Sequence, residues 1–371
     1  MSRQEDNWAR NLLNAIKSEN SKEIDALLSC SSIYRLDVRV DVSVKKIQEL
    51  DSSLWTTIVC VGDIFNDSSV DIKKKYAQVL DLASNSQTLT SNHELPNFYR
   101  MILLRAKTEF SRNRLLTEGN LDLLISSLRS LFTVLKKSEL FQSLSVVLES
   151  LFHFYFSISQ FHQCTYLLKM IAPITNIIFA AADKREAFGL HFYISRLNFF
   201  DGEIEKTEEH LEEALKLVKS KKQLSKLFSF LIPVKLTLGK TVLPSIAREC
   251  DLGDLGVMVQ ATIDGNIKIF DELLRKEAKK WIQTGVYFLL GECRSILLRN
   301  LFKKVWVLRG KPISLPLRDL SHAYTFSSGV LIPNQELVGI VSGLIFKDFI
   351  RGLIYPDKEI LHLRKLPFTD L

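Results

Sequence analysis

The chain has 371 residues, of which 46% are hydrophobic and 25% are charged, and its formal net charge is +7. This composition is typical of an ordinary soluble protein, and a chain of this length commonly divides into two or more units. The five cysteines are scattered and odd in number, which argues against a disulfide-stabilised secreted protein. The charged N-terminus does not look like a secretory signal, and the longest apolar stretches, such as residues 171–182, are too short to cross a bilayer. We therefore expect no membrane partner.

Glycine and proline divide the chain into parts with different secondary structure. Only two of the 15 glycines and two of the nine prolines precede residue 189, so the first half is predicted to be almost entirely helical. Residues 1–94 are interpreted as an N-terminal helical region to which the sequence assigns no function. Within it, residues 36–44 alternate as a strand would, and we predict an extended linker there because no pairing partner lies nearby.

Residues 95–283 show repeated amphipathic helices joined by short turns. Pairing successive helices would bury each apolar stripe on the next, which is typical of a helical-repeat solenoid. The clearest repeat surrounds Gly202, where Phe200 ends one helix and Leu211 and Leu215 face back from the next, much as in a tetratricopeptide-like hairpin. The predicted helices span residues 97–112, 121–136, 140–160, 163–183, 186–200, 204–218 and 223–238.

A long helix is predicted after Thr284 and Gly285, and it would join the solenoid to the last part of the chain. Apolar residues recur along it every three or four positions, while Lys303 and Lys304 lie between them, so one face is predicted to be buried and another to be available to a partner. The residues expected to face a core are Phe288, Leu289, Cys293, Ile296, Leu297, Leu301, Val305 and Leu308.

After Gly310 the pattern changes to short elements. With the end of the long helix, their order is that of a winged helix, so residues 284–371 are interpreted as the long helix and a winged helix. The turn between the last two strands is predicted at Pro356 and Asp357, since proline presets the backbone and aspartate tolerates turn geometry. The predicted elements are an extended segment at 311–316, helices at 317–324 and 334–347, and strands at 349–354 and 359–363.

Five segments in the second half of the chain carry a resemblance to a known family. They are YISRLNFFDGEIEKTEEHLEEAL from Tyr193, FLIPVKLTLGK from Phe230, DGNIKIFDELL from Asp264, RNLFKKVW from Arg299 and LPF from Leu366. Together they resemble the PCI-domain proteins, above all the subfamily that works in nuclear mRNA export as a partner of GANP-type scaffolds, and they are also similar to the signalosome-associated PCI subunit. The resemblance implies an all-α dominated fold, a right-handed α-helical solenoid followed by a C-terminal winged helix, with the PCI domain at about residues 185–371.

The same resemblance implies a non-catalytic scaffold subunit of a hetero-oligomeric complex for transcription-coupled mRNA export. The expected partners are a GANP-type PCI scaffold protein and the small acidic subunit shared with the proteasome lid. The expected location is the nucleus, at the nuclear pore, with the cytoplasm as a second location. A signalosome-related or proteasome-lid-like assembly is the alternative, because a shared fold does not determine the complex.

Positive charge is concentrated at the C-terminal end. Residues 299–371 contain eleven Lys or Arg and six Asp or Glu, so +5 of the net +7 lies there. Such an excess favours contact with RNA or DNA phosphates, although a winged helix in a PCI protein can equally serve as a protein-binding module. The predicted nucleic-acid contacts are Arg299, Lys303, Lys304, Arg309, Lys311, Lys347, Arg351, Lys358, Arg364 and Lys365. The predicted partner contacts are Trp306, Phe326, Phe349 and Leu353.

The sequence contains no recognised catalytic or cofactor motif. Phosphate-binding glycine loops, zinc-protease helices and nucleophile elbows are all missing from it, and the seven histidines are scattered. The six glutamates between residues 203 and 213 lack convergent histidines, so a solvated helix face is favoured over a metal site. We therefore predict no catalytic residues, cofactor or metal, and an enzyme with an unrecognised site remains the second alternative.

Overall fold

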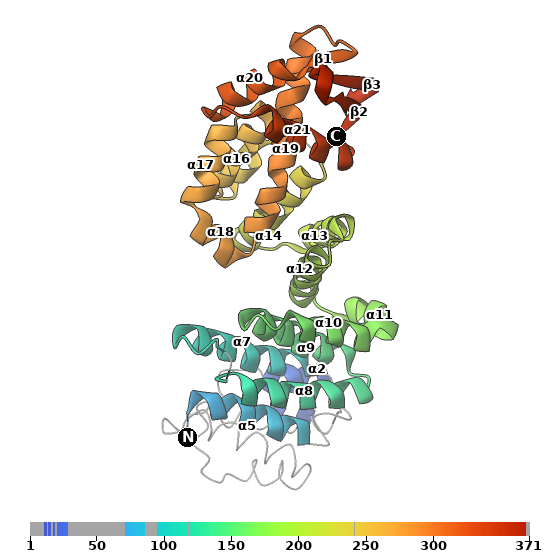
Figure 1. Ribbon diagram of the computed structural model, residues 1–371. Helices are drawn as coiled ribbons and strands as arrows, with labels where there is room; N and C mark the ends of the chain where they lie inside the picture. The colour runs from blue at the N-terminus through green and yellow to red at the C-terminus, as the bar shows by residue number, and fades with distance from the viewer. Residues whose placement is uncertain are drawn as a thin grey trace. The chain divides into compact units, whose positions relative to one another are not determined.

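The structure is a computed structural model that describes residues 11–12, 14–15, 18, 21–28, 71–85, 95–117, 119–240 and 242–368. The chain forms two compact units, residues 1–197 and residues 198–371, which divide inside one helix (Figure 1). Helices dominate both units, and a small sheet near the C-terminus confirms the predicted fold class. The linker predicted at residues 36–44 lies outside the described residues, and the boundaries predicted at 94/95 and 283/284 remain predictions.

The first unit is built from helices that pack on one another. Its described helices are α2 (Ser21–Leu28), α5 (Ile72–Asn85), α7 (Pro96–Arg112), α8 (Asp122–Lys137), α9 (Phe141–Ser157), α10 (Phe161–Ile171), η2 (Ala172–Ile174), α11 (Thr175–Ala181) and most of α12 (Lys184–Phe200). α8 packs against α5 and α9, and α7 packs against α9. Most of α9 is buried as a result, with Leu144, Leu148 and Leu151 in its core-facing rows. Helices of this kind stabilise each other mainly through their neighbours, as in repeat proteins.

One predicted helix of this unit is divided in two. The apolar pattern at residues 163–183 predicted a single helix, and the structure has α10, the 3₁₀ turn η2 and α11 instead. Pro173 lies in the turn, where it cannot donate the backbone hydrogen bond that a continuous helix needs. The segment Phe161–Ala181 is long and apolar enough to cross a membrane by length and composition alone. Such a match is weak evidence for a span, and both α10 and α11 pack on α9.

The second unit continues with helices and ends in a winged helix. Its helices before residue 310 are α13 (Ile204–Leu217), α14 (Lys221–Thr237), α15 (Pro244–Glu249), α16 (Gly253–Asp264), α17 (Ile267–Lys276), α18 (Ala278–Thr284) and α19 (Tyr287–Leu308). α14 begins at a capping box, in which the Gln223 backbone N–H donates to Ser220 Oγ and the Ser220 N–H donates to Gln223 Oε1. This reciprocal pair satisfies two donors that a helix start leaves unpaired.

The turn between α16 and α17 depends on a glycine. Gly265 has a φ of +72°, which a residue without a side chain adopts at little cost. A Cβ at this position would lie 2.9 Å from the Cα of Leu301, so the turn approaches the backbone of α19 directly. Asn266 then caps α17 by accepting the Ile269 N–H on its Oδ1 at 3.1 Å. The glycine therefore allows α16, α17 and α19 to pack together.

The long helix α19 is buried on more than one face. It packs against α14, α16, α17 and α20 (Leu317–Ser328). Leu289, Cys293, Ile296 and Leu297 are buried as predicted, together with Leu298 and Phe302, whereas Leu301 and Val305 are half-buried. The prediction was wrong at both ends of the stripe, because Phe288 is 76% exposed and Leu308 is 86% exposed. These two side chains lie at opposite ends of the helix.

The winged helix follows with the predicted order of elements. They are β1 (Ser314–Pro316), α20, α21 (Asn334–Phe346), β2 (Ile350–Tyr355), the 3₁₀ turn η3 (Pro356–Lys358) and β3 (Ile360–Phe368). The sheet is antiparallel with strand order β1-β3-β2, and Pro356 and Asp357 lie in the turn between β2 and β3, as predicted. Gly352 pairs with Leu363, whereas Ile350 pairs with Phe368. Residues 364–367 of β3 therefore bulge out opposite Arg351.

Candidate nucleic-acid and partner interface

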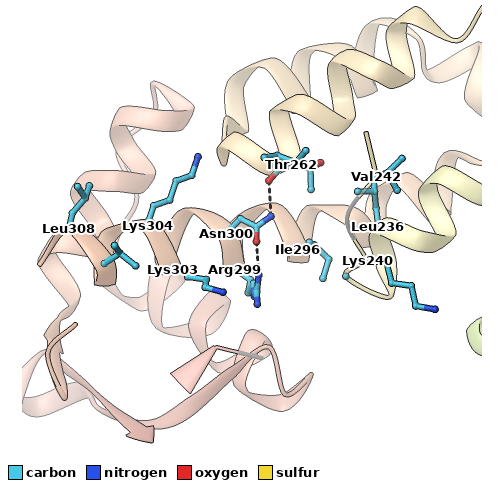
Figure 2. Close-up of a pocket in the computed structure, with 13 residues that line it drawn as sticks. Leu236, Lys240, Val242, Thr262, Ile296, Arg299, Asn300, Lys303, Lys304 and Leu308 are labelled. Carbon is cyan, nitrogen blue, oxygen red and sulfur yellow. Dashed lines mark hydrogen bonds between the residues drawn. The ribbon is translucent and has the colours of Figure 1, made fainter. Parts of the chain in front are cut away.

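Six of the ten predicted cations line two hollows in the second unit. One is a pocket of about 580 Å³ between the end of α16, the segment after α14 and the second half of α19, here called the α19 pocket. Figure 2 shows its lining residues. They are Leu236, Gly239, Lys240, Val242, Thr262, Ile263, Ile296, Arg299, Asn300, Lys303, Lys304, Val307 and Leu308. Aliphatic walls with four cations favour an anionic ligand that also has apolar groups.

Arg299 in the α19 pocket differs from the prediction. It was predicted to be an exposed phosphate contact, but only 5% of it is exposed because α19 is packed on this side. Its Nη1 donates to Asn300 Oδ1 at 2.8 Å, and Asn300 Nδ2 donates to the Thr262 carbonyl at 3.0 Å (Figure 2). The guanidinium is thus held by the pocket wall and is not available to a ligand on the outer surface.

The lysines of the α19 pocket have contacts inside the protein. Lys304 Nζ donates to the Asp264 carbonyl at 3.0 Å and lies 3.7 Å from the carboxylate of the same residue. Lys240 Nζ forms an ion pair of 2.5 Å with Glu208, which is almost fully buried. Lys303 is half-buried beside them. Part of the positive charge of the pocket is therefore already neutralised.

The second hollow is a cleft of about 340 Å³ at the end of α19, here called the Trp306 cleft. It is lined by Trp306, Lys311, Pro312, Ile313, Leu363, Arg364, Lys365, Leu366 and Pro367. The indole Nε1 donates to the Pro312 carbonyl at 3.0 Å, and the ring packs against Phe368 with a centroid separation of 5.5 Å. The cleft thus unites one predicted partner contact with three predicted nucleic-acid contacts.

The bulge in β3 forms one wall of the Trp306 cleft. It displaces Arg364, Lys365 and Leu366 from the sheet, and all three are exposed. Within the described part of the chain, no ion pair involves Arg364 or Lys365. Pro367 gives the reason for the bulge, since proline cannot donate a ladder hydrogen bond and is found at bulges or strand edges. That proline is the sequence signal from which the bulge could have been predicted.

Several other predicted cations form contacts inside the protein. Arg309 pairs with the buried Asp319 at 2.5 Å, Lys347 with Glu292 at 2.7 Å, and Arg351 with Asp348 at 2.9 Å. The hydrogen bond from Arg351 lowers the pKa of the Asp348 carboxyl. Lys358 lies over the Tyr355 ring, 5.9 Å from its centroid. Exposed ion pairs are weak, yet each contributes a carboxylate that would repel a phosphate.

The predicted partner contacts are distributed over the winged helix. Phe326 on α20 is 93% exposed, and Leu353 on the edge strand β2 is also exposed. Trp306 and Phe349 are half-buried. Sequence reasoning missed Phe346 at the end of α21, which is 92% exposed, because it continues the apolar pattern of its helix. Exposed aromatic residues of this kind are typical of interaction surfaces.

The acidic side chains of the described residues are not grouped as metal ligands. In the parts of the chain that the structure describes, no group of three or more His, Cys, Asp or Glu side chains is placed to hold a metal ion. The glutamates of α13 contact lysines instead, since Glu208 and Glu212 both pair with Lys235 of α14. What the second unit offers is cationic and apolar surface.

Comparisons with known proteins agree with this architecture. The chain is 28% identical over 228 residues to PCI domain-containing protein 2 of Xenopus laevis, covering 61% of this chain and 56% of that protein. It is 29% identical over 229 residues to the PCI domain-containing protein 2 homolog of Drosophila melanogaster, covering 61% and 57%. A Protein CSN12 homolog of Gibberella zeae is 28% identical over 200 residues, covering 49% of this chain and 44% of that protein.

The chain therefore spans about half the length of the curated relatives it matches. No protein-family model matches it. Two of these relatives are named for a PCI domain, and the structure has the helices and the C-terminal winged helix that the resemblance implies. In sequence and in fold, the chain is therefore similar to the PCI-domain proteins.

Proposed function

We propose that this protein is a non-catalytic scaffold subunit of a nuclear complex for transcription-coupled mRNA export. It binds a GANP-type PCI scaffold protein and a small acidic subunit, and it contacts RNA or DNA through its winged helix. The proposed location is the nucleus, at the nuclear pore, with a second pool in the cytoplasm. The observation that carries the proposal is the winged helix itself, where the excess of positive charge lies beside exposed apolar side chains.

The charge and the apolar surface support different parts of the proposal. Arg364 and Lys365 are exposed on the β3 bulge, and cations of this kind bind phosphates by releasing counterions. Phe326 and Leu353 are exposed on α20 and on the edge strand β2. Exposed apolar side chains on a polar surface are suited to a protein partner. One winged helix could thus hold a protein and a nucleic acid together.

Co-elution tests the assembly. The purified chain, mixed with a GANP-type scaffold protein and the small acidic subunit, should elute from a sizing column as one complex at both low and moderate salt. Phe326→Asp should weaken that complex, because it places a charge in an apolar contact. Phe288→Asp is the matched control, since Phe288 is also an exposed phenylalanine but lies at the start of α19, outside the predicted contacts. Elution of the wild-type chain alone under both conditions would contradict the assembly.

A signalosome-related or proteasome-lid-like assembly is the second candidate. The observation that favours it is the similarity to a Protein CSN12 homolog. Affinity purification of the chain from its native organism distinguishes the two assemblies by the subunits that accompany it. Turnover of nucleotide, peptide or phosphoester substrates by the purified chain alone would instead favour an enzyme.

A further inference from the structure

The Trp306 cleft combines an aromatic ring with cations from two segments of the chain. Lys311 lies between α19 and β1, and Arg364 and Lys365 lie on the β3 bulge. Among the described residues, those that line the cleft include these three cations and no carboxylate. This differs from the α19 pocket, whose Lys240 and Lys304 contact Glu208 and Asp264.

The backbone around the cleft adopts unusual conformations that place these side chains. Lys311 has a φ of +60° and Leu366 has a φ of +58°, a left-handed region that costs a side-chain-bearing residue free energy. Both residues line the cleft, one in the segment after α19 and the other in β3. Surrounding structure has to maintain such conformations, and they cluster at ligand-binding sites.

The indole is held in place by its neighbours. Its Nε1 donates to the Pro312 carbonyl, and its ring packs on Phe368. Lys311 Nζ lies over the same ring, 5.9 Å from its centroid. A flat ring that is fixed in position and flanked by cations has the two elements of sites for single-stranded nucleic acids, a stacking platform and a path for the backbone.

We infer that the Trp306 cleft binds one unpaired base of a single-stranded RNA or DNA, with the base stacked on Trp306 and the flanking phosphates on Lys311, Arg364 and Lys365. This inference rests on the proposed function, in which the winged helix contacts nucleic acid. It adds that contact requires an unpaired base. On binding, the base takes the place of the Lys311 ammonium over the ring, and the ammonium moves to a phosphate.

The indole favours a nucleic acid over an acidic peptide. The face of an aromatic ring carries negative electrostatic potential, so it repels carboxylates. A base stacks on such a ring through dispersion and the burial of apolar surface. The volume of the cleft, about 340 Å³, is at the small end of the usual range for ligand sites, about 300–1,000 Å³. A duplex offers no unpaired base to such a cleft, and its phosphates alone would reach the exposed cations.

Fluorescence anisotropy with matched oligonucleotides tests the inference on the full chain. The probes are a fluorescein-labelled 12-nucleotide oligouridylate and a 12-base-pair duplex of mixed sequence. Trp306→Leu, which keeps an apolar side chain but removes the stacking ring, should weaken binding of the single strand by about 5- to 100-fold. Binding of the duplex should change by less than about twofold, and the salt dependence should keep its slope because no cation is removed.

Two further variants separate stacking from folding. Trp306→Phe retains a ring and should retain most of the single-strand affinity. Phe288→Leu removes an exposed aromatic side chain of the same unit outside the cleft and should leave binding of both probes unchanged. Thermal melts of all variants show whether any loss of binding follows from unfolding. Equal loss with Trp306→Leu and Trp306→Phe, in folded protein, would overturn the stacking contact.

The outcomes distinguish the inference from the proposed function. Failure of the wild-type chain to bind either probe at low salt contradicts both. Binding of both probes with no effect of Trp306→Leu overturns the inference alone and leaves nucleic-acid contact in place. A synthetic peptide of alternating aspartate and leucine provides the remaining comparison: if it binds in a Trp306-dependent manner while the oligouridylate does not, the cleft is a peptide site and the inference is wrong.

Discussion

Burial changes the chemistry of two cysteines, one in each unit. Cys164 of α10 and Cys293 of α19 are buried, and burial raises the pKa of each thiol to about 12 because the thiolate would lose its hydration. Iodoacetamide at pH 8 should therefore modify neither residue in the native protein and both in guanidinium-unfolded protein. Mass spectrometry of the tryptic peptides measures the difference. Rapid modification of Cys293 in the native state would contradict its position in the core.

The raised pKa of Cys293 also determines how the stability of the protein changes with pH. The folded-state pKa of Cys293 lies above the unfolded value of about 8.5, so the folded state retains the proton over a wider range. The stability linked to this thiol is complete below about pH 8.5 and is lost as the pH rises toward 12. Cys293→Ala cannot ionise here, so its melting temperature should fall less between pH 8 and pH 10 than that of the wild type. An equal fall in melting temperature for the two proteins would mean that other groups cause the loss of stability at alkaline pH.

At the scale of elements, two glycines in turns provide a matched comparison. Gly202 and Gly265 both have positive φ, but a Cβ at Gly202 would meet nothing within 4 Å, whereas one at Gly265 would meet Leu301 at 2.9 Å. Gly202→Ala should lower the free energy of unfolding by about 1 kcal/mol, the cost of the conformation alone. Gly265→Ala should lower it by at least about 2–3 kcal/mol, because overpacking is added. Urea unfolding measures the free energy of unfolding of both variants. Equal losses of that free energy would mean that α19 moves to make room for the methyl group at residue 265.

The helices were predictable because their signals are local. Apolar periodicity and the distribution of glycine and proline predicted the positions of α7, α8, α9 and α13 to within a few residues. The faces of α19 were harder, since the helix packs against neighbours on several sides and a single stripe does not define what is buried. Arg299 was therefore predicted to be exposed and is buried, while Phe288 was predicted to be buried and is exposed.

The candidate site was predictable only in part. Trp306 and Lys311 are close in sequence, so a shared surface could be expected. Arg364 and Lys365 join them because β3 pairs with β1 and β2 in a particular register, and register is a long-range property of the sheet. Ion pairs such as that between Lys347 and Glu292, 55 residues apart, follow from the same tertiary packing.

At the scale of the whole molecule, positive charge is concentrated toward the C-terminus, and two pairs of charge reversals test whether its exact position affects nucleic-acid binding. Arg364→Glu with Lys365→Glu changes the net charge by −4, and so does Lys347→Glu with Arg351→Glu. The first pair lies on the β3 bulge, whereas the second pair already contacts Glu292 and Asp348. Both double variants alter the long-range field of the molecule equally. A difference between them therefore reports direct binding of phosphates.

The double variant Arg364→Glu with Lys365→Glu should weaken binding to single and double strands of any sequence. The slope of its binding constant against salt concentration, on logarithmic axes, should flatten by about 0.7–0.9 units for each phosphate that the protein no longer neutralises. The Lys347 and Arg351 variant should have the smaller effect, because its cations are already paired with carboxylates. Both should melt close to the wild type, since exposed substitutions rarely change the free energy of unfolding by more than about 0.5 kcal/mol. Anisotropy titrations at four salt concentrations provide the slopes. An equal fall in affinity for the two variants would mean that the net charge of the winged helix attracts nucleic acid without direct binding at the bulge.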